Sequence, residues 1–231
     1  MRSTVLLARV LAISVFLFVI AGIARSNGNT PRFEIPAIGT RFFNIYYVKD
    51  SSDRLVPDSI AMSPMVPDEQ VVVAAGVKAH GRSNCIVLLG PLHPDTTFIS
   101  FAKNGDLYVL HHLERDSSMP SWEWLPFSLQ PGKVLKTKPV REVYFKNSQR
   151  PWTLMHRREL EVLGNDTVSV SGKVFDCIKL RAVEIRSEDG IDYKNAFTYW
   201  YSPEIGYFLR LSFGWNGPYF MHQQVEQITH G

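Results

Sequence analysis

An unbroken apolar stretch opens the chain, and an alternating pattern of apolar and polar residues follows it. From Val10 to Ala24 the sequence carries no charged residue, and the basic residues Arg2 and Arg9 precede this run. A basic start, an apolar run and small residues at its end are typical of a secretory signal. We therefore predict that residues 1–26 direct the rest of the chain across a membrane.

The length of this stretch leaves its fate open. The run that starts at Val10 is shorter than the ~20 residues that span a bilayer as a helix, but a run over 5–24 that includes Arg9 reaches this length. Residues 1–26 are thus predicted to be either a cleaved signal peptide or an N-terminal hydrophobic helix that anchors the protein with its C-terminus outside. A polar linker is predicted over 27–34. Sequencing the N-terminus of the mature protein distinguishes the two fates.

Beyond the linker, short alternating runs are typical of strands with one buried face. Turn-forming residues separate the runs, and no long stretch has the period of an amphipathic helix. An all-β fold is therefore predicted, either an antiparallel curved sheet or an open half-barrel. One run, 154–163, is also compatible with a short helix. The predicted strands and hairpin cover 41–48, 71–75, 85–89, 98–110, 154–163, 167–170, 175–185, 193–201 and 207–213.

The pair Asn104-Gly105 predicts the clearest turn. This pair favours a tight hairpin turn with positive φ at both central residues. Further turns are predicted at Gly164–Asp166 and at 187–190, where small and acidic residues cluster. The proline-containing segments 50–70 and 116–133 are predicted to be irregular.

Two parts of the chain resemble each other. Gly39 precedes Cys85 by 46 positions, Gly132 precedes Cys177 by 45 positions, and each part ends in a hairpin with a glycine turn. Chance is the alternative explanation, because glycine is common before strands. The repeat predicts two similar β units that form one continuous domain, at 35–115 and 116–231.

Three short motifs occur in order within residues 122–211. They are Leu125-Pro126-Phe127 with Pro131-Gly132-Lys133, then Val168-x-Val170-x-Gly172-x-x-Phe175-Asp176-Cys177, then Tyr199-Trp200-Tyr201-Ser202-Pro203-Glu204-Ile205-Gly206-Tyr207. This order resembles an uncharacterised group of exported bacterial β proteins. The group is similar in fold to open half-barrel lipoprotein carriers of the LolA/LolB type.

The resemblance implies an antiparallel sheet wrapped around an apolar cavity, and it carries over no catalytic residue. The chain departs from the group's pattern in two places. Ser171-Gly172 stands where a Pro-Ala-Gly turn is usual, and Lys133–Leu135 lacks the tryptophan that usually follows the glycine. The resemblance therefore bears on the fold more than on the function.

Charge excludes one class of partner. The chain has 25 basic and 22 acidic residues, and two of the basic residues lie in 1–24, which holds no acidic residue. The net charge of +3 therefore falls to +1 for the rest of the chain, with 23 basic against 22 acidic residues. A nearly neutral body attracts nucleic acid weakly. Nucleic acid is not an expected partner.

The reactive residue types form no catalytic or metal-binding pattern. His111 and His112 are adjacent, so on a strand they point to opposite faces and cannot hold one metal ion together. The two cysteines, Cys85 and Cys177, are too few for a zinc site. In an oxidising compartment they are a candidate disulfide, and otherwise they are buried free thiols. No catalytic residue, cofactor or metal is predicted, and we do not expect an enzyme.

Aromatic residues make up 12% of the chain and cluster near 122–127 and toward the C-terminus. They form either the core of an aromatic-rich sheet or a contact face for an apolar ligand or a partner protein. The candidate contact residues are Trp122, Trp124, Trp200, Trp215 and Tyr219.

These observations predict a non-catalytic extracytoplasmic protein, in the bacterial periplasm, that binds an apolar ligand or lipid or a partner protein of the envelope. The alternative is an accessory subunit of an envelope membrane complex, held in the inner membrane through residues 5–24 with its C-terminus outside. A hydrolase is the third possibility, and it requires a cleft in which polar residues with shifted pKa values converge.

Overall fold

The computed structural model describes residues 34–56, 67–90, 96–110, 122–144, 152–188, 191–215 and 219–231. These residues belong to one compact unit, Phe33–Gly231. The predicted export segment, most of the linker and the pair His111-His112 lie outside the described residues. Within the described ranges, no helix is long and apolar enough to cross a membrane.

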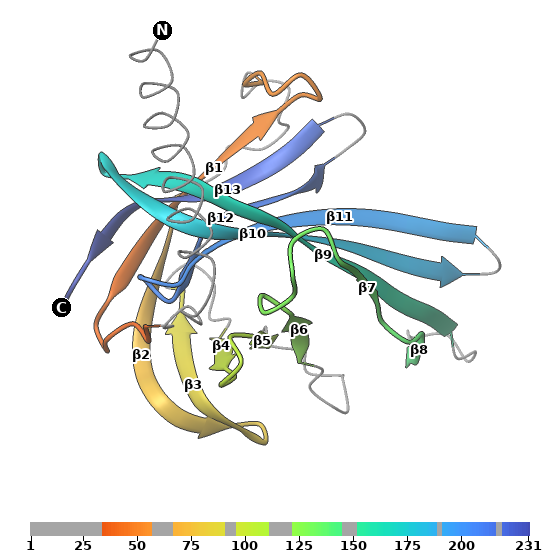
Figure 1. Ribbon diagram of the computed structural model, residues 1–231, viewed down its shortest axis with the longest axis horizontal. Coiled ribbons are helices and arrows are strands. Elements are labelled where there is room, and N and C mark those ends of the chain that lie inside the picture. The colour runs from red at the N-terminus through yellow and green to blue at the C-terminus, as the bar shows by residue number, and fades with distance from the viewer. Residues whose placement is uncertain are drawn as a thin grey trace, which may run out of the picture. The chain divides into compact units, whose positions relative to one another are not determined.

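The fold is all-β, as predicted, and the described strands form one curved antiparallel sheet that does not close (Figure 1). The strands are β1 (Arg41–Lys49), β2 (Asp68–Ala79), β3 (Arg82–Leu89), β4 (Thr96–Phe101), β5 (Leu107–Leu110), β6 (Glu123–Leu125), β7 (Val134–Lys136), β8 (Val140–Tyr144), β9 (Trp152–Val170), β10 (Lys173–Glu188), β11 (Ile191–Ser202), β12 (Tyr207–Trp215) and β13 (Tyr219–Thr229).

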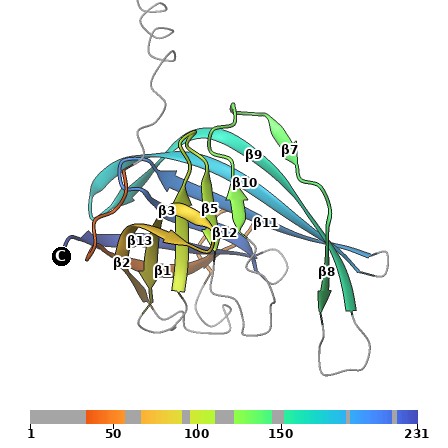
Figure 2. The ribbon, with the colours of Figure 1, turned by 90° about the horizontal axis from the view of Figure 1, so that it is seen from below.

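The strand order is β6-β5-β4-β3-β2-β1-β13-β12-β11-β10-β9-β7, and β8 also pairs with β9. The first and last strands of the chain therefore lie side by side in the middle of the sheet, with Arg41 opposite Thr229 and Lys49 opposite Phe220. Figure 2 shows how β9, β10 and β11 arch over the concave side. The sheet ends at β6 on one side, and on the other side at β7 and β8, which pair one after the other with the outer edge of β9.

Strand β13 is absent from the sequence prediction, which ends at residue 213. Its inward positions Met221, Gln223 and Val225 alternate with His222 and Gln224, so polar residues occur on both faces. This mixture hides the apolar period of two on which strand prediction depends. The missed strand is the one that joins the N-terminal and C-terminal parts of the sheet.

Strand β9 confirms that 154–163 is extended, and it corrects the turn predicted at Gly164–Asp166. The strand continues through these residues to Val170, and its pairing with β10 shifts register by one residue between Val162 and Gly164. Gly164 has φ of 117°, so the site is a β-bulge that bends the strand instead of reversing it. The chain reverses at Ser171 and Gly172, which both have positive φ.

The hairpin at Asn104-Gly105 is confirmed, but its turn is longer than predicted. Phe101 pairs with Leu107, so five residues connect β4 and β5. Asn104 does not have positive φ, while Gly105 has φ of 92°. The buried carboxylate of Asp106 explains the longer loop, because it accepts hydrogen bonds from Asn104 Nδ2 at 3.0 Å, Trp124 Nε1 at 2.9 Å and the Ser128 N–H at 3.1 Å.

The two glycines of the predicted repeat have the same local structure. Gly39 and Gly132 have φ of 88° and 80°, and each lies in a turn directly before a strand. Gly39 N–H donates to the carbonyl of Val72 in β2, and Gly132 N–H donates to that of Val162 in β9, both at 2.8 Å. The strands of the first predicted unit, β1 to β5, are neighbours in the sheet. Those of the second unit lie on the other side of β1, except for β6, which pairs with β5 at the edge of the first unit.

The candidate disulfide is not formed. Cys85 in β3 and Cys177 in β10 are both buried free thiols, and five strands separate β3 from β10 along the sheet. The Cys85 sulfur lies 3.6 Å from the carbonyl oxygen of Arg82, and the Cys177 sulfur lies 3.8 Å from that of Phe175. Burial, and then the charge of Asp166, raise the pKa of Cys177 to about 12, so this thiol stays protonated.

The structure explains the glycine at position 206 of the motif that spans residues 199–207. It has φ of 71°, and its N–H donates to the carbonyl of Ser202 at 2.8 Å. The segment at Glu34 crosses directly over it, with the Glu34 N–H donating to the carbonyl of Pro203 at 3.0 Å. A Cβ at Gly206 would lie 2.0 Å from the Glu34 carbonyl oxygen and 2.8 Å from Pro36 Cδ. Only glycine leaves room for this crossing.

Candidate ligand-binding cavity

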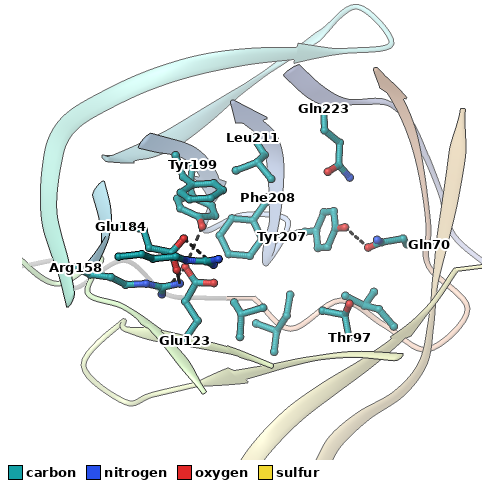
Figure 3. A pocket seen from close by; sticks show the side chains of 15 residues that line it. Gln70, Thr97, Glu123, Arg158, Glu184, Tyr199, Tyr207, Phe208, Leu211 and Gln223 are labelled. Atoms are coloured by element: carbon teal, nitrogen blue, oxygen red, sulfur yellow. Dashed lines mark hydrogen bonds and ion pairs between the residues drawn. The ribbon is translucent and has the colours of Figure 1, made fainter. Parts of the chain in front are cut away.

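The concave side of the sheet encloses a cavity of about 310 Å³ (Figure 3). Residues from ten strands line it, which shows that the curvature of the whole sheet creates it. Much of the lining is apolar. The apolar side chains that line the cavity are Leu88, Ile99, Val109, Phe197, Phe208 and Leu211.

One end of the cavity carries four charged side chains. Arg158 Nη1 lies 2.8 Å from Glu123 Oε1, and Arg158 Nη2 lies 3.8 Å from Glu184 Oε1. Arg186 Nη2 lies 3.1 Å from Glu184 Oε2. The side chains of Glu123, Arg158 and Glu184 are 15%, 20% and 7% exposed, while that of Arg186 is 49% exposed. We call these four side chains the charged cluster, and Arg186 is its most exposed member.

Strands β6 and β9 approach each other at the charged cluster, although they are not neighbours in the sheet order. The ion pair from Glu123 in β6 to Arg158 in β9 crosses this gap, and the hydroxyl of Tyr199 in β11 donates to Glu123 at 3.0 Å. We call this place the seam. Among the described residues, side chains connect β6 and β9 here, and no ladder of backbone hydrogen bonds does. Burial, and then the charge of Glu123, raise the pKa of Tyr199 well above its usual range. Tyr199 therefore remains a protonated donor.

The opposite end of the cavity is polar but uncharged, as Figure 3 shows for Tyr207 and Gln70. The Tyr207 hydroxyl donates to Gln70 Oε1, and its ring stacks on that of Phe42 with a centroid distance of 3.9 Å. Thr97 and Gln223 also line the cavity. Burial raises the pKa of Tyr207, so its hydroxyl also stays neutral. The cavity thus has a charged end, an apolar middle and a neutral polar end.

The lining residues supply hydrogen-bonding and ion-pairing groups. Among the described lining residues there is no His, Cys, Ser or Lys, and the side chains that can act as nucleophiles or bases are Thr97, Glu123, Glu184, Tyr199 and Tyr207. The described ranges also hold no group of three or more His, Cys, Asp or Glu side chains that could bind a metal ion. What the arrangement offers chemically is a site for a small molecule that is largely apolar and polar at its ends.

Trp122, Trp124 and Trp200, three of the five candidate contact residues, lie away from this cavity. Trp124 Nε1 donates to Asp106, and Trp122 Nε1 donates to the carbonyl of His80 at 3.1 Å. Trp200 is 7% exposed. These tryptophans hold the sheet together on faces that point away from the cavity. Tyr219 is half-buried and pairs with Trp215 between β12 and β13.

Trp200 is at the centre of a second polar group. Its Nε1 donates to Asp166 Oδ2 at 2.8 Å, and the Lys179 ammonium and the Arg210 guanidinium lie 4.8 Å and 5.4 Å from its ring. The hydrogen bond from Trp200, followed by those from Thr167 and Lys179, lowers the pKa of Asp166. These contacts connect the bent end of β9 to β10, β11 and β12.

His222 lies near this group and predicts a pH dependence of stability. Its ring stacks on Tyr47 at 5.0 Å, and burial, followed by the charges of Lys49 and Arg210, lowers its pKa from 6.5 to about 4, although Asp53 opposes the shift. The unfolded state therefore binds a proton between about pH 6.5 and pH 4 that the folded state does not, so stability falls as the pH falls through this window.

We expect this loss to be about 1–2 kcal/mol, since the ring is only partly buried. Urea unfolding of the wild type and of His222→Gln at a series of pH values measures it. The difference between the two free energies of unfolding should change between pH 7 and pH 4. A difference that is the same at every pH contradicts the assigned shift.

The sequence prediction missed the charged cluster. The signal was present, because Glu184 and Arg158 are opposite each other across the β9–β10 pair and carry complementary charges. The register that places them together depends on the bulge at Gly164. Counting back from the Ser171-Gly172 turn without a bulge places Glu159 opposite Glu184, which pairs two acidic residues.

Comparisons with known proteins give similar structures but no family. No protein-family model matches the chain. No curated protein matches it either. The hypothetical lipoprotein YmcC of Escherichia coli superposes with a TM-score of 0.39 and 8% identity, over 90% of this chain and 94% of that one.

Two other solved structures are similar to the same extent. One is a proposed exported protein with a YmcC-like fold from Bacteroides fragilis, with a TM-score of 0.36 and 13% identity over 85% of this chain and 98% of that one. The other is a proposed lipoprotein from Parabacteroides distasonis, with a TM-score of 0.39 and 11% identity over 86% of this chain and 99% of that one. At these TM-scores and sequence identities, the similar structures do not indicate what this protein does.

Proposed function

We propose that this protein is a non-catalytic extracytoplasmic binding protein that holds a small, mainly apolar ligand in the cavity on the concave side of its sheet. The cavity of about 310 Å³, lined by apolar side chains between two polar ends, carries this proposal. Its size is at the lower end of the range of about 300–1,000 Å³ that is typical of small-molecule sites.

The energetics favour such an occupant. Apolar groups of a ligand that enter the space between Ile99, Phe208 and Leu211 leave water, and each buried methylene group contributes about 0.8 kcal/mol. The polar ends orient the ligand, because their hydrogen-bonding groups are held by partners on other strands. Export by residues 1–26 places this activity outside the cytoplasm in our proposal. The anchored accessory subunit depends on residues 5–24, outside the described part of the chain, and stays a prediction.

Filling the cavity should remove ligand binding and leave the fold intact. Val109 is 4% exposed and lines the cavity, and Val109→Phe places a ring in the space that the ligand needs. We expect this variant to bind the neutral apolar probe N-phenylnaphthylamine at least about tenfold more weakly than the wild type, since a filled cavity cannot take up the probe. Fluorescence titration measures this affinity on the exported protein, purified with the N-terminus that the host cell produces.

Val87→Phe is the matched control. Val87 pairs with Phe98 on the face of the sheet that points away from the cavity, so the same substitution there should leave probe binding unchanged. Native mass spectrometry of the wild type should detect a co-purifying apolar molecule that Val109→Phe lacks. A wild type that carries no such molecule and does not bind the probe would contradict the proposed function.

A further inference from the structure

The charged cluster has more hydrogen-bond donors than acceptors to offer a ligand. A guanidinium has five N–H donors in a planar fork. Within the cluster, Arg158 uses Nη1 and Nη2 toward Glu123 and Glu184, and Arg186 uses Nη2 toward Glu184. These contacts leave further N–H groups on both arginines, and both arginines line the cavity.

Three of the four carboxylate oxygens of the cluster already face a donor. Glu123 Oε1 takes both the ion pair from Arg158 and the hydrogen bond from the Tyr199 hydroxyl. Glu184 faces Arg158 with one oxygen and Arg186 with the other. A ligand that brings acceptors therefore finds partners here, whereas a ligand that brings donors competes with Arg158, Arg186 and Tyr199 for the same carboxylates.

We propose that the ligand is an anionic single-chain amphiphile whose carboxylate or phosphate group binds Arg158 and Arg186, with its chain along Ile99, Val109 and Leu211. This inference rests on the proposed function and specifies the ligand of that same cavity. A guanidinium binds planar or tetrahedral anions through parallel N–H···O contacts, which are among the stronger hydrogen bonds in proteins.

The exposure of the two arginines fits this orientation. Arg158 is 20% exposed and is held in place by Glu123, while Arg186 is 49% exposed and contacts Glu184 at the rim. The anionic group thus lies where the cavity meets solvent and keeps part of its hydration, which limits the cost of burying a charge. The carboxylates of Glu123 and Glu184 repel the anion, but each already faces an arginine that offsets its charge.

Ligands that share one chain and differ in the polar group test the inference. Isothermal titration calorimetry of the full chain at pH 7 compares decanoate, decyl phosphate, decanol and decylamine. We expect at least one of the two anions to bind about tenfold more tightly than decanol, and decylamine to bind no more tightly than decanol. The tighter of decanoate and decyl phosphate identifies whether the site prefers a carboxylate or a phosphate.

Arg186→Gln provides the decisive variant, because the Arg186 side chain is 49% exposed and Glu184 keeps Arg158 as an ion-pair partner at 3.8 Å. It should weaken binding of the preferred anion by about tenfold, and it should weaken binding of decanol by much less. Arg181→Gln is the control, since Arg181 is in the same strand, is 51% exposed and pairs with Glu161 outside the cavity lining. It should change neither affinity.

Decanol or decylamine binding as tightly as both anions would overturn the inference while the proposed function survives. The same holds if Arg186→Gln weakens decanol and the anions equally. If none of the four ligands binds and N-phenylnaphthylamine also fails to bind, the inference and the proposed function are both overturned.

Discussion

Replacing Gly206 by alanine is expected to lower the free energy of unfolding by about 3 kcal/mol. At φ of 71° an alanine costs about 1–2 kcal/mol more than glycine. Its Cβ would also lie 2.0 Å from the carbonyl oxygen of Glu34, so the crossing segment has to move and the hydrogen bond from Glu34 to Pro203 is lost. That loss adds about 1 kcal/mol. Urea unfolding of the full chain measures the change.

Gly172→Ala is the matched control for this prediction. Gly172 has φ of 80°, but nothing lies within 4 Å of the position of its Cβ. Gly172→Ala should therefore lower the free energy of unfolding only by the cost of a positive φ at alanine, about 1–2 kcal/mol. If both variants lose the same stability, the crossing of residue 34 over Gly206 contributes nothing, and our explanation of this glycine is wrong.

Removing the Arg158 side chain is the other change with a large expected effect. Arg158→Ala leaves Glu123, with 15% side-chain exposure, without its ion pair and Glu184 with Arg186. Breaking a fully buried pair by removal of one partner costs about 3–5 kcal/mol. We expect about 2–3 kcal/mol here, because Arg158 is partly exposed and Tyr199 still donates to Glu123.

Arg157→Ala tests whether the loss comes from the buried cluster. Arg157 is the next residue in β9, and it pairs at 3.4 Å with Asp192 where both side chains are exposed. An exposed pair contributes at most about 1 kcal/mol, so this variant should unfold at nearly the wild-type urea concentration. An equal loss for Arg157→Ala and Arg158→Ala would show that the ion pair across the seam does not stabilise the fold.

The sequence predicted the class of fold because the alternation of apolar and polar residues is a local signal. It works in β10, for example, where the buried residues Phe175 and Cys177 alternate with the exposed residue Asp176. It fails for β13, because Gln223 faces the cavity and breaks the apolar pattern. It also misplaces a turn at Gly164–Asp166, because a glycine with positive φ can make a bulge as well as a turn.

The candidate site was less predictable than the fold. Tryptophan indicates buried aromatic contacts, but Trp124 and Trp200 donate hydrogen bonds to Asp106 and Asp166 on faces away from the cavity. The polar end of the cavity instead depends on charged residues from β6, β9 and β10, which are up to 63 positions apart between Glu123 and Arg186. Only the curvature and the register of the sheet bring them together, and neither can be deduced from local alternation.

The seam gives the protein a place where it can open at low cost. Separating two neighbouring strands of the described sheet breaks a ladder of backbone hydrogen bonds. Separating β6 from β9 breaks the ion pair from Glu123 to Arg158 and the hydrogen bond from Tyr199 to Glu123, and it leaves those ladders whole. Local opening of this kind requires far less free energy than global unfolding. If the proposed ligand is too large for the rim, we expect it to enter by this local opening. Stability of the fold and speed of uptake would then be set by different parts of the same sheet.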